Sequence, residues 1–154
     1  MMKEMTITRT DSNNADFLAL VQNLDRYLAE VDGSEHAFYH QFNKVDKLNN
    51  VVLGYVDEKA VACGAFKPLS DFEVEIKRMW TQPDYRGKGL GKEILKQLEI
   101  WAVELGFKSV VLETGKRMPD AIGLYTGFGY ISIENYGQYV GVDNSVCFKK
   151  IQAS

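Results

Sequence analysis

Alternating apolar and polar residues mark most of the strands expected in this chain of 154 residues. Residues 73–81 read Glu-Val-Glu-Ile-Lys-Arg-Met-Trp-Thr and illustrate the pattern. Successive side chains of a strand point to opposite faces, so such a run carries a charged face. This pattern, with its β-branched and aromatic residues, predicts seven strands, at residues 7–10, 51–56, 60–66, 73–81, 108–114, 130–133 and 145–151.

Apolar residues that recur three and four positions apart predict the helices. The apolar face of the first helix runs from Phe17 to Leu28. Asp11 or Ser12 is its expected N-cap, and the Asp-Gly-Ser sequence at residues 32–34 is expected to end it. Three further helices are predicted, one at residues 34–42, one at 92–105 ended by Gly106, and one at 120–126 begun by Pro119.

Turn signals and connection lengths predict how the strands pair. The polar residues 57–59 and the turn at 68–71 connect three consecutive strands, which are therefore expected to pair antiparallel. The helix at 92–105 joins two strands, which should therefore lie parallel in one βαβ unit. The predicted fold class is α/β (α+β), a mixed and mostly antiparallel sheet with one central parallel crossover, flanked by helices. The length predicts a single domain over residues 1–154.

A glycine-rich segment at residues 83–92 joins the central strand to the helix that follows it. It reads Pro-Asp-Tyr-Arg-Gly-Lys-Gly-Leu-Gly-Lys. Glycine lets the backbone turn sharply and approach a ligand closely, and a helix start offers unpaired N–H groups and a positive dipole end. Arg86, Lys88 and Lys92 add positive charge. The segment therefore predicts an anion site, most naturally for phosphate.

The glycine spacing distinguishes three phosphate-binding patterns. A Walker loop places four residues between its first glycine and Gly-Lys and then a hydroxyl residue, whereas Gly87 and Gly91 enclose three and a glutamate follows the lysine. The dinucleotide fingerprint Gly-x-Gly-x-x-Gly also fails. Arg86, Gly89 and Gly91 fit Arg/Gln-x-x-Gly-x-Gly/Ala, the acyl-CoA pyrophosphate loop of the GNAT superfamily of N-acetyltransferases, which this chain resembles. The alternative is a glycine-rich turn that binds nothing.

A second motif strengthens the resemblance. Residues 121–125 read Ala-Ile-Gly-Leu-Tyr and residues 127–130 read Gly-Phe-Gly-Tyr, similar to the family's Ala-x-x-Leu-Tyr followed by Gly-Phe/Tyr. Motifs and element order agree over residues 50–151. In the family, two parallel central strands splay apart and admit the pantetheine arm. One departure is Met118, where many members have an Asn or Gln that reaches the pantetheine; either backbone groups replace that contact here or it is absent.

The resemblance implies an acetyl-CoA site built mainly from backbone groups. N–H groups of the glycine loop would bind the pyrophosphate, and the edge of the preceding strand would pair with the pantetheine amides as another strand would. The N–H near Met79 would stabilise the oxyanion of the thioester. The residues so assigned are Met79, Trp80, Thr81, Arg86, Gly87, Lys88, Gly89, Leu90, Gly91 and Lys92.

Two side chains are candidates for proton transfer. Tyr125 matches the family's general-acid tyrosine, which protonates the leaving thiolate; otherwise it is a packing tyrosine. A lysine-like amine with a pKa of ~10.4 is largely protonated at neutral pH, so a base is useful. Glu75 stands where glutamate-base members carry theirs and could act as the base or relay a water, although a salt bridge with Lys77 or with a neighbouring strand is the alternative. Glu113, which ends the next parallel strand, is another candidate carboxylate.

Composition limits the class of protein. The chain is 45% hydrophobic and 25% charged, as ordinary globular proteins are. Its net charge of −3 argues against general nucleic-acid binding. No run of ~20 apolar residues and no signal peptide are apparent, so a cytoplasmic protein without membrane contact is expected. Cys63 and Cys147 form no Cys-x-x-Cys pair; buried reduced thiols and no metal are expected, with a disulfide or reactive thiol as the alternative.

The sequence gives little information about the substrate that accepts the acyl group. In the family its pocket is formed by the first two helices and the late hairpin, here residues 27–42 and 136–142. His36 and His40 share a helix face but are best explained as surface residues. The leading hypothesis is an acetyl-CoA-dependent N-acetyltransferase acting on a primary amine of a small molecule or protein. A longer acyl-CoA, a hydroxyl acceptor, or a catalytically silent acyl-CoA sensor remains open, as does a homodimer.

Overall fold

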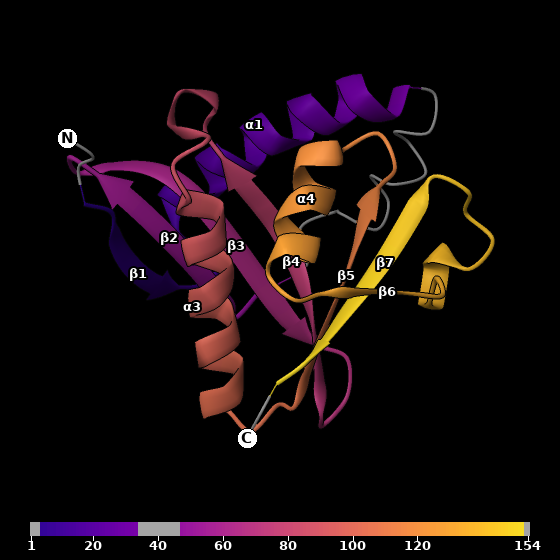
Figure 1. The fold of residues 1–154 in the computed structure, drawn as a ribbon. Coiled ribbons are helices and arrows are strands. Elements are labelled where there is room, and N and C mark those ends of the chain that lie inside the picture. The colour runs from indigo at the N-terminus through magenta and orange to yellow at the C-terminus, as the bar shows by residue number, and fades with distance from the viewer. Residues whose placement is uncertain (1–3, 34–46, 153–154) are drawn as a thin grey trace. The chain divides into compact units, whose positions relative to one another are not determined.

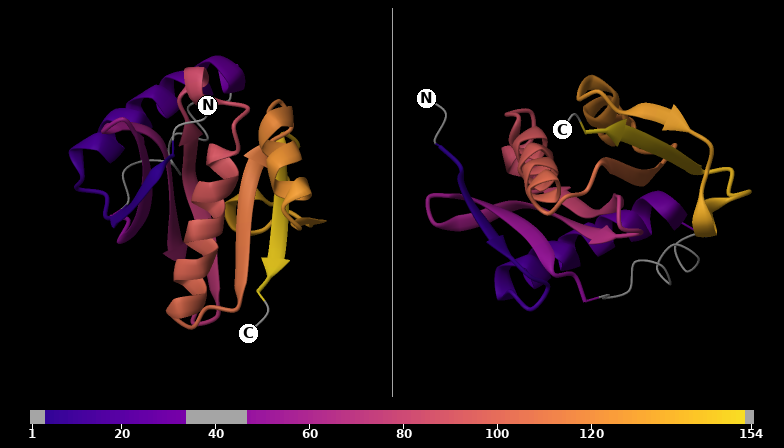
Figure 2. Two further views of the ribbon diagram at one scale, coloured as in Figure 1. Left: turned by 60° about the vertical axis from the view of Figure 1, so that its left-hand side comes forward. Right: turned by 90° about the horizontal axis from the view of Figure 1, so that it is seen from below.

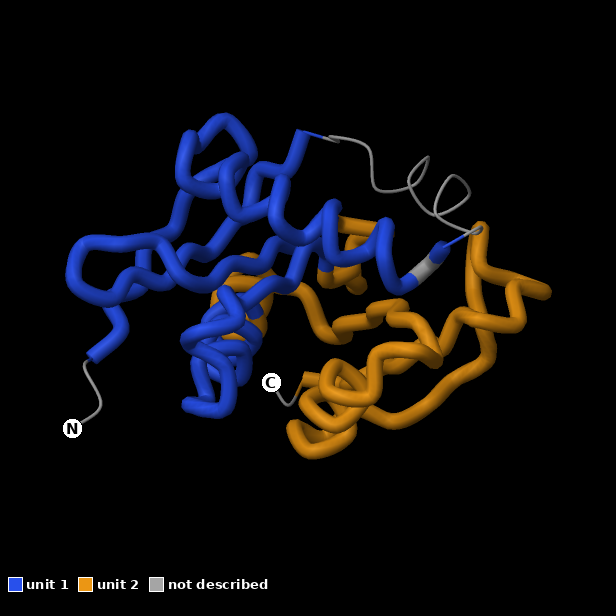
Figure 3. The backbone as a smooth tube through the Cα atoms, turned by 90° about the horizontal axis from the view of Figure 1, so that it is seen from above, with its two compact units in different colours: residues 1–67, 77–98 blue, residues 68–76, 99–154 orange. Residues whose placement is uncertain are grey.

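The structure is a computed structural model that describes residues 4–33 and 47–152. These residues form two compact units, coloured separately in Figure 3. Of the described residues, unit 1 comprises 4–33, 47–67 and 77–98, and unit 2 comprises 68–76 and 99–152. The strand at 73–81 and the helix that follows it contribute to both units, and the expectation of a single domain stays a prediction. Across the described ranges, no helix is long and apolar enough to cross a membrane.

Unit 1 is built on an antiparallel sheet. Its strands are β1 (Thr6–Thr10), β2 (Asn50–Val56), β3 (Lys59–Pro68) and the second half of β4 (Glu73–Thr81). In the register of β2 and β3, Leu53 lies opposite Cys63. The β2–β3 turn holds Asp57 and Glu58 at φ angles of 51° and 65°. The predicted hairpin is therefore confirmed, with a left-handed two-residue turn that matches the twist of the strands.

Two helices cover opposite faces of this sheet (Figure 2). Helix α1 (Ala15–Asp32) packs its apolar face on the side that presents Leu53 and Cys63. The alternate residue Gly64 faces the other way, where a Cβ would meet Ile94 and Leu98 of α3 (Leu90–Glu104). Glycine at that position lets the helix approach the strand closely. The side chains buried between α1 and the sheet include Phe17, Leu20, Val21, Leu24, Val51, Ala65 and Trp80.

The N-terminus of α1 differs from the prediction. Asn14, and not Asp11 or Ser12, is the N-cap, because its side chain accepts hydrogen bonds from the N–H groups of Asp16 and Phe17. Asp11 instead accepts from Asn13, and the Ser12 hydroxyl accepts from the N–H of Leu48 at 3.0 Å. Both predicted caps are thus used to hold the turn between β1 and α1.

Unit 2 carries the remaining strands and one short helix. These are β5 (Ser109–Gly115), α4 (Pro119–Gly127), β6 (Ile131–Ile133) and β7 (Ser145–Ile151). The first half of β4 runs parallel to β5, with Glu75 opposite Val111. β7 pairs antiparallel with both β5 and β6. Hydrogen bonds link the seven strands in the order β1-β2-β3-β4-β5-β7-β6 (Figure 1), which confirms the predicted mixed sheet with its parallel pair.

Several boundaries were predicted closely and others were missed. β4 and β7 have the predicted limits, and Gly106, with φ at 94°, ends α3 as expected. Helix α3 begins at Leu90, two residues earlier than predicted. Two 3-10 turns were not predicted, Pro83–Tyr85 and Gly137–Tyr139. The helix predicted at 34–42, with His36 and His40, lies outside the described residues.

Candidate active site

The glycine loop combines left-handed glycines with the start of α3. Gly87 and Gly89 have φ angles of 77° and 80°, a backbone conformation that other residues adopt only at a cost. The N–H of Glu93 donates to the carbonyl of Gly89 at 3.1 Å, which makes Gly89 the last residue before the helix. The N–H groups of the first helical turn have no intrahelical acceptors. The loop therefore offers donors and a positive dipole end to an anion.

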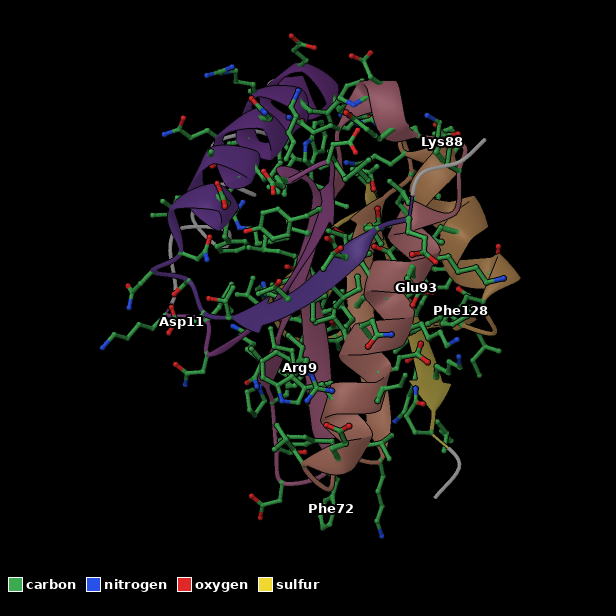
Figure 4. The ribbon with its side chains drawn as sticks, turned by 90° about the vertical axis from the view of Figure 1, so that its left-hand side faces the viewer. Arg9, Asp11, Phe72, Lys88, Glu93 and Phe128 are labelled. Carbon is green, nitrogen blue, oxygen red and sulfur yellow. The ribbon has the colours of Figure 1, made fainter. Side chains whose placement is uncertain are left out.

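Space around this loop is open. A Cβ at Gly87 or Gly89 would meet no heavy atom within 4 Å, so these positions favour glycine because of backbone conformation rather than crowding. The segment from Arg86 to Gly89 is exposed. Lys88 lies in the loop and Glu93 in the first turn of α3 (Figure 4). The residues present thus fit a pyrophosphate bound through the main chain.

The side chain of Arg86 links the glycine loop to the end of β4. Its Nε donates to the carbonyl of Thr81 at 3.0 Å, and its guanidinium carbon lies 4.7 Å from the centre of the Trp80 ring. The backbone N–H of Arg86 donates to the carbonyl of Pro83 at the end of the 3-10 turn. The arginine of the motif therefore stacks on an aromatic face and shapes the loop, a role that sequence reasoning did not assign to it.

The end of β4 presents its side chains to the interior of unit 1. Trp80 is 8% exposed, and its indole N–H donates to Gln82 Oε1 at 2.8 Å. Met79 packs against Gly64 of β3. Just before it, Arg78 has φ at 60° within the strand, so the regular alternation of side chains is interrupted there. The side chains of Met79 and Trp80 are thus used for packing within unit 1.

In unit 2, Glu75 is almost completely buried, with 2% of its surface exposed. The hydroxyl of Tyr136, from the loop between β6 and β7, donates to Glu75 Oε2 at 2.5 Å. Burial, the charge of Glu75 and this hydrogen bond raise the pKa of Tyr136. Tyr136 is therefore the proton donor of the pair, and Glu75 Oε2 is the acceptor.

The first residue of β7, which follows this loop, donates a hydroxyl to the second candidate carboxylate. Ser145 Oγ donates to Glu113 Oε2 at 2.6 Å. Burial, followed by the charges of Glu113 and Glu75, raises the pKa of Tyr139. For Cys147, burial and both carboxylates raise the pKa, while the N–H of Tyr136 opposes the shift. The two glutamates are thus close enough to act on the same neighbouring side chains.

Tyr125 lies on α4 and is 6% exposed. Burial raises its pKa, and the charge of Glu113 adds to the effect. Its ring meets Tyr130 edge-on with 5.9 Å between centres and Phe148 at 6.3 Å. The backbone N–H of Tyr130 donates to the carbonyl of Tyr125. Tyr125 is therefore held firmly and keeps its proton at neutral pH.

Sequence reasoning placed Tyr136 in the hairpin expected to form the acceptor pocket and Ser145 at the start of a strand, and it linked neither residue to a glutamate. No local pattern links either residue to a glutamate, because the partners are 61 and 32 residues away. Cys63 and Cys147 are free and buried, as expected. Within the described ranges, no three His, Cys, Asp or Glu side chains are grouped to hold a metal ion.

Comparison with known proteins identifies the family. The family model of the acetyltransferase (GNAT) family matches residues 17–130, which include both motifs and the intervening strand. This chain belongs to the GNAT family. An IAA acetyltransferase of Azospirillum brasilense is 28% identical over 140 residues, which cover 90% of this chain and 92% of that protein.

Other relatives match over shorter stretches. The uncharacterized N-acetyltransferase YsnE of Bacillus subtilis is 33% identical over 95 residues, 60% of this chain and 63% of that protein. The chain covers less than two thirds of the length of four further relatives that are named as N-acetyltransferases. Three of these four, like YsnE, are themselves uncharacterized.

Solved structures share the fold over nearly the whole chain. A candidate acyl-CoA N-acyltransferase from Klebsiella pneumoniae has a TM-score of 0.81 at 29% identity and covers 96% of this chain and 97% of its own. A GNAT acetyltransferase from Elizabethkingia anophelis, solved with acetyl-CoA bound, has a TM-score of 0.69 at 15% identity and covers 96% and 98%. The second likeness concerns the fold alone.

Proposed function

We propose that this GNAT protein is an acetyl-CoA-dependent N-acetyltransferase that acts on a primary amine of a small molecule or protein. The observation that carries the proposal is the loop at the start of α3, where Gly87 and Gly89 take left-handed conformations and α3 begins at Leu90. Such a loop suits the pyrophosphate of CoA. The backbone of residues 79–81 and 86–92 would hold the cosubstrate.

Acetyl-CoA supplies a thioester whose carbonyl a neutral amine can attack directly in a ternary complex. Glu75 would take the amine proton, since it is a buried carboxylate held in place by a hydrogen bond. The N–H of Met79 would stabilise the oxyanion, a contribution of roughly 3 kcal/mol for one such donor. Tyr125 would give its proton to the departing thiolate.

The raised pKa of Tyr125 bears on its proposed role. A tyrosine that keeps its proton is present in the donating form throughout the neutral range. Its acidity is lower than that of the leaving thiol, whose usual pKa is ~8.5. The thiolate already leaves moderately well unaided, so Tyr125 would accelerate the step without being indispensable to it.

The test is thiol release from acetyl-CoA across a panel of primary amines, combined with calorimetric titration of CoA. An enzyme gives amine-dependent thiol release, and Glu75→Gln lowers it by about a hundredfold, a typical contribution of a general base. Tight CoA binding without turnover on any amine would favour the sensor. A folded protein that binds no CoA would exclude both functions.

A further inference from the structure

The loop between β6 and β7 (residues 134–144) and the first residue of β7 each donate one hydroxyl to a candidate carboxylate of unit 2. Tyr136 reaches Glu75 on β4, and Ser145, the first residue of β7, reaches Glu113 on β5. A carboxylate that is 2% exposed pays a large desolvation penalty unless donors compensate it. The Tyr136 hydrogen bond, at 2.5 Å, is as short as charge-assisted O–H···O⁻ bonds are.

The loop holds Tyr136 in a defined orientation. Its ring meets the Tyr139 ring edge-on, with 5.9 Å between centres and 87° between planes. The side-chain amide of Asn135 donates to the carbonyls of Val142 and Ser145, both at 3.1 Å, and so closes the loop on itself. A side chain fixed by packing and by its own loop can fix its hydrogen-bond partner in turn.

We infer that Tyr136 is a positioning residue that holds the Glu75 carboxyl group in the orientation needed to accept the amine proton. The inference rests on the proposed role of Glu75 as the base. Tyr136 acts through the carboxylate and retains its own proton throughout. The titratable groups that interact with Glu75 from neighbouring elements include Tyr136 and Tyr139 of the loop and Cys147 of β7. Glu113 of β5 acts on Tyr139 and Cys147 as well.

The test is Tyr136→Phe, which removes the hydroxyl and keeps the ring that packs on Tyr139. The ¹³C chemical shift of the Glu75 carboxyl carbon is followed against pH by NMR in protein labelled with ¹³C-glutamate. The signal of Glu75 is assigned as the one that is missing in Glu75→Gln. A hydrogen bond to the carboxylate favours its charged form, so its loss should move the titration of Glu75 to higher pH. The acid limb of kcat/KM for thiol release should move the same way, with about a tenfold loss at neutral pH.

Tyr55→Phe is the matched control. Tyr55 also donates its hydroxyl to a carboxylate, Asp16 Oδ2 at 2.7 Å, but within unit 1. This variant should leave the Glu75 titration and the pH profile unchanged. In a Glu75→Gln background, adding Tyr136→Phe should cost little more activity, because residues that act as a unit are not additive.

Three results decide the inference. An unmoved Glu75 titration or an unmoved acid limb in folded Tyr136→Phe overturns it. An equal loss of activity from Tyr136→Phe with and without Glu75 also overturns it, since Tyr136 would then act independently. Unchanged turnover in Glu75→Gln alone is a different failure, which refutes the proposed base itself. Affinity for CoA, measured by calorimetry, should stay unchanged in both single variants.

Discussion

Arg78 Nη1 lies 2.7 Å from Asp25 Oδ1, so a left-handed residue of β4 is tied by an ion pair to helix α1. The Arg78 side chain is 7% exposed and that of Asp25 is 34% exposed. A left-handed conformation costs a residue with a Cβ roughly 1–2 kcal/mol. Strained backbone persists where surrounding contacts hold it, and here the ion pair with α1 provides such a contact next to Met79.

Asp25→Ala should lower the free energy of unfolding by about 2 kcal/mol, because it leaves the buried guanidinium of Arg78 without its carboxylate. The expected loss is below that of a fully buried pair, since Asp25 is partly exposed. Urea unfolding followed by circular dichroism measures it. Arg26→Ala on the same helix is the control, because the Arg26–Asn23 hydrogen bond is exposed. A loss no greater than in this control would show that the pair contributes little.

Gly89→Glu should abolish CoA binding in a folded protein. The change adds bulk and negative charge at a left-handed position of the loop proposed for the pyrophosphate, with φ at 80°. Gly106→Glu is a matched control, because Gly106 also has a left-handed backbone, with φ at 94°, but follows the other end of α3. It should lose stability and keep CoA affinity. Equal CoA affinity in both variants would refute the loop assignment.

Tyr125→Phe should lower kcat by more than it raises the KM for acetyl-CoA. The ring and its contacts with Tyr130 and Phe148 are kept, while the proposed proton donor is lost. We expect a decrease of about tenfold to a hundredfold, since the thiolate also leaves unaided. Steady-state thiol release provides the measurement. An unaltered kcat would remove Tyr125 from the mechanism.

Cys63 should make the protein less stable at high pH. Burial, only partly offset by the charge of Arg78 and a backbone hydrogen bond, raises the pKa of this thiol from 9.0 to about 12. Between these values the unfolded chain loses the proton and the folded chain keeps it, so stability falls as pH rises. Its effect is absent below pH 9.

The measurement compares the wild type with Cys63→Ala. Other titrating groups are common to both proteins and cancel in the difference. The stability advantage of the wild type at pH 8 should shrink by roughly 2 kcal/mol at pH 10.5, at ~1.4 kcal/mol per pH unit beyond 9. A difference that does not change with pH would show that the thiol is not buried as described.

Much of unit 1 could be predicted from local sequence. The Asp57-Glu58 turn, the limits of β4 and the glycine loop all follow from residues that are neighbours in the chain. The cap of α1 could not be predicted in the same way, because Asp11, Ser12 and Asn14 are all good cap residues. The Ser12 hydroxyl accepts a hydrogen bond from Leu48, a contact that local sequence does not reveal.

The candidate site likewise contains some parts that local sequence predicted and others that it did not. The glycine spacing and the Ala-Ile-Gly-Leu-Tyr motif indicated the family and singled out Tyr125 as a candidate side chain. Each motif is a short run of consecutive residues, so it can be recognised without knowledge of the tertiary structure. The exposed helix N-terminus also follows directly from that run. Arg86, by contrast, was expected to add charge for phosphate, and the structure stacks it on Trp80. The position of that ring depends on how α1 packs against the sheet.

The sequence by itself determined the order of the elements, the parallel pair and the loop that marks a GNAT protein, because periodicity and glycine conformation act between near neighbours. Only the tertiary structure decided that Tyr136 donates to Glu75 and Ser145 to Glu113, and that Arg78 adopts a left-handed backbone beside Asp25. These contacts join residues far apart in the chain. They depend on strand register and on the path of one loop, and no local pattern encodes either.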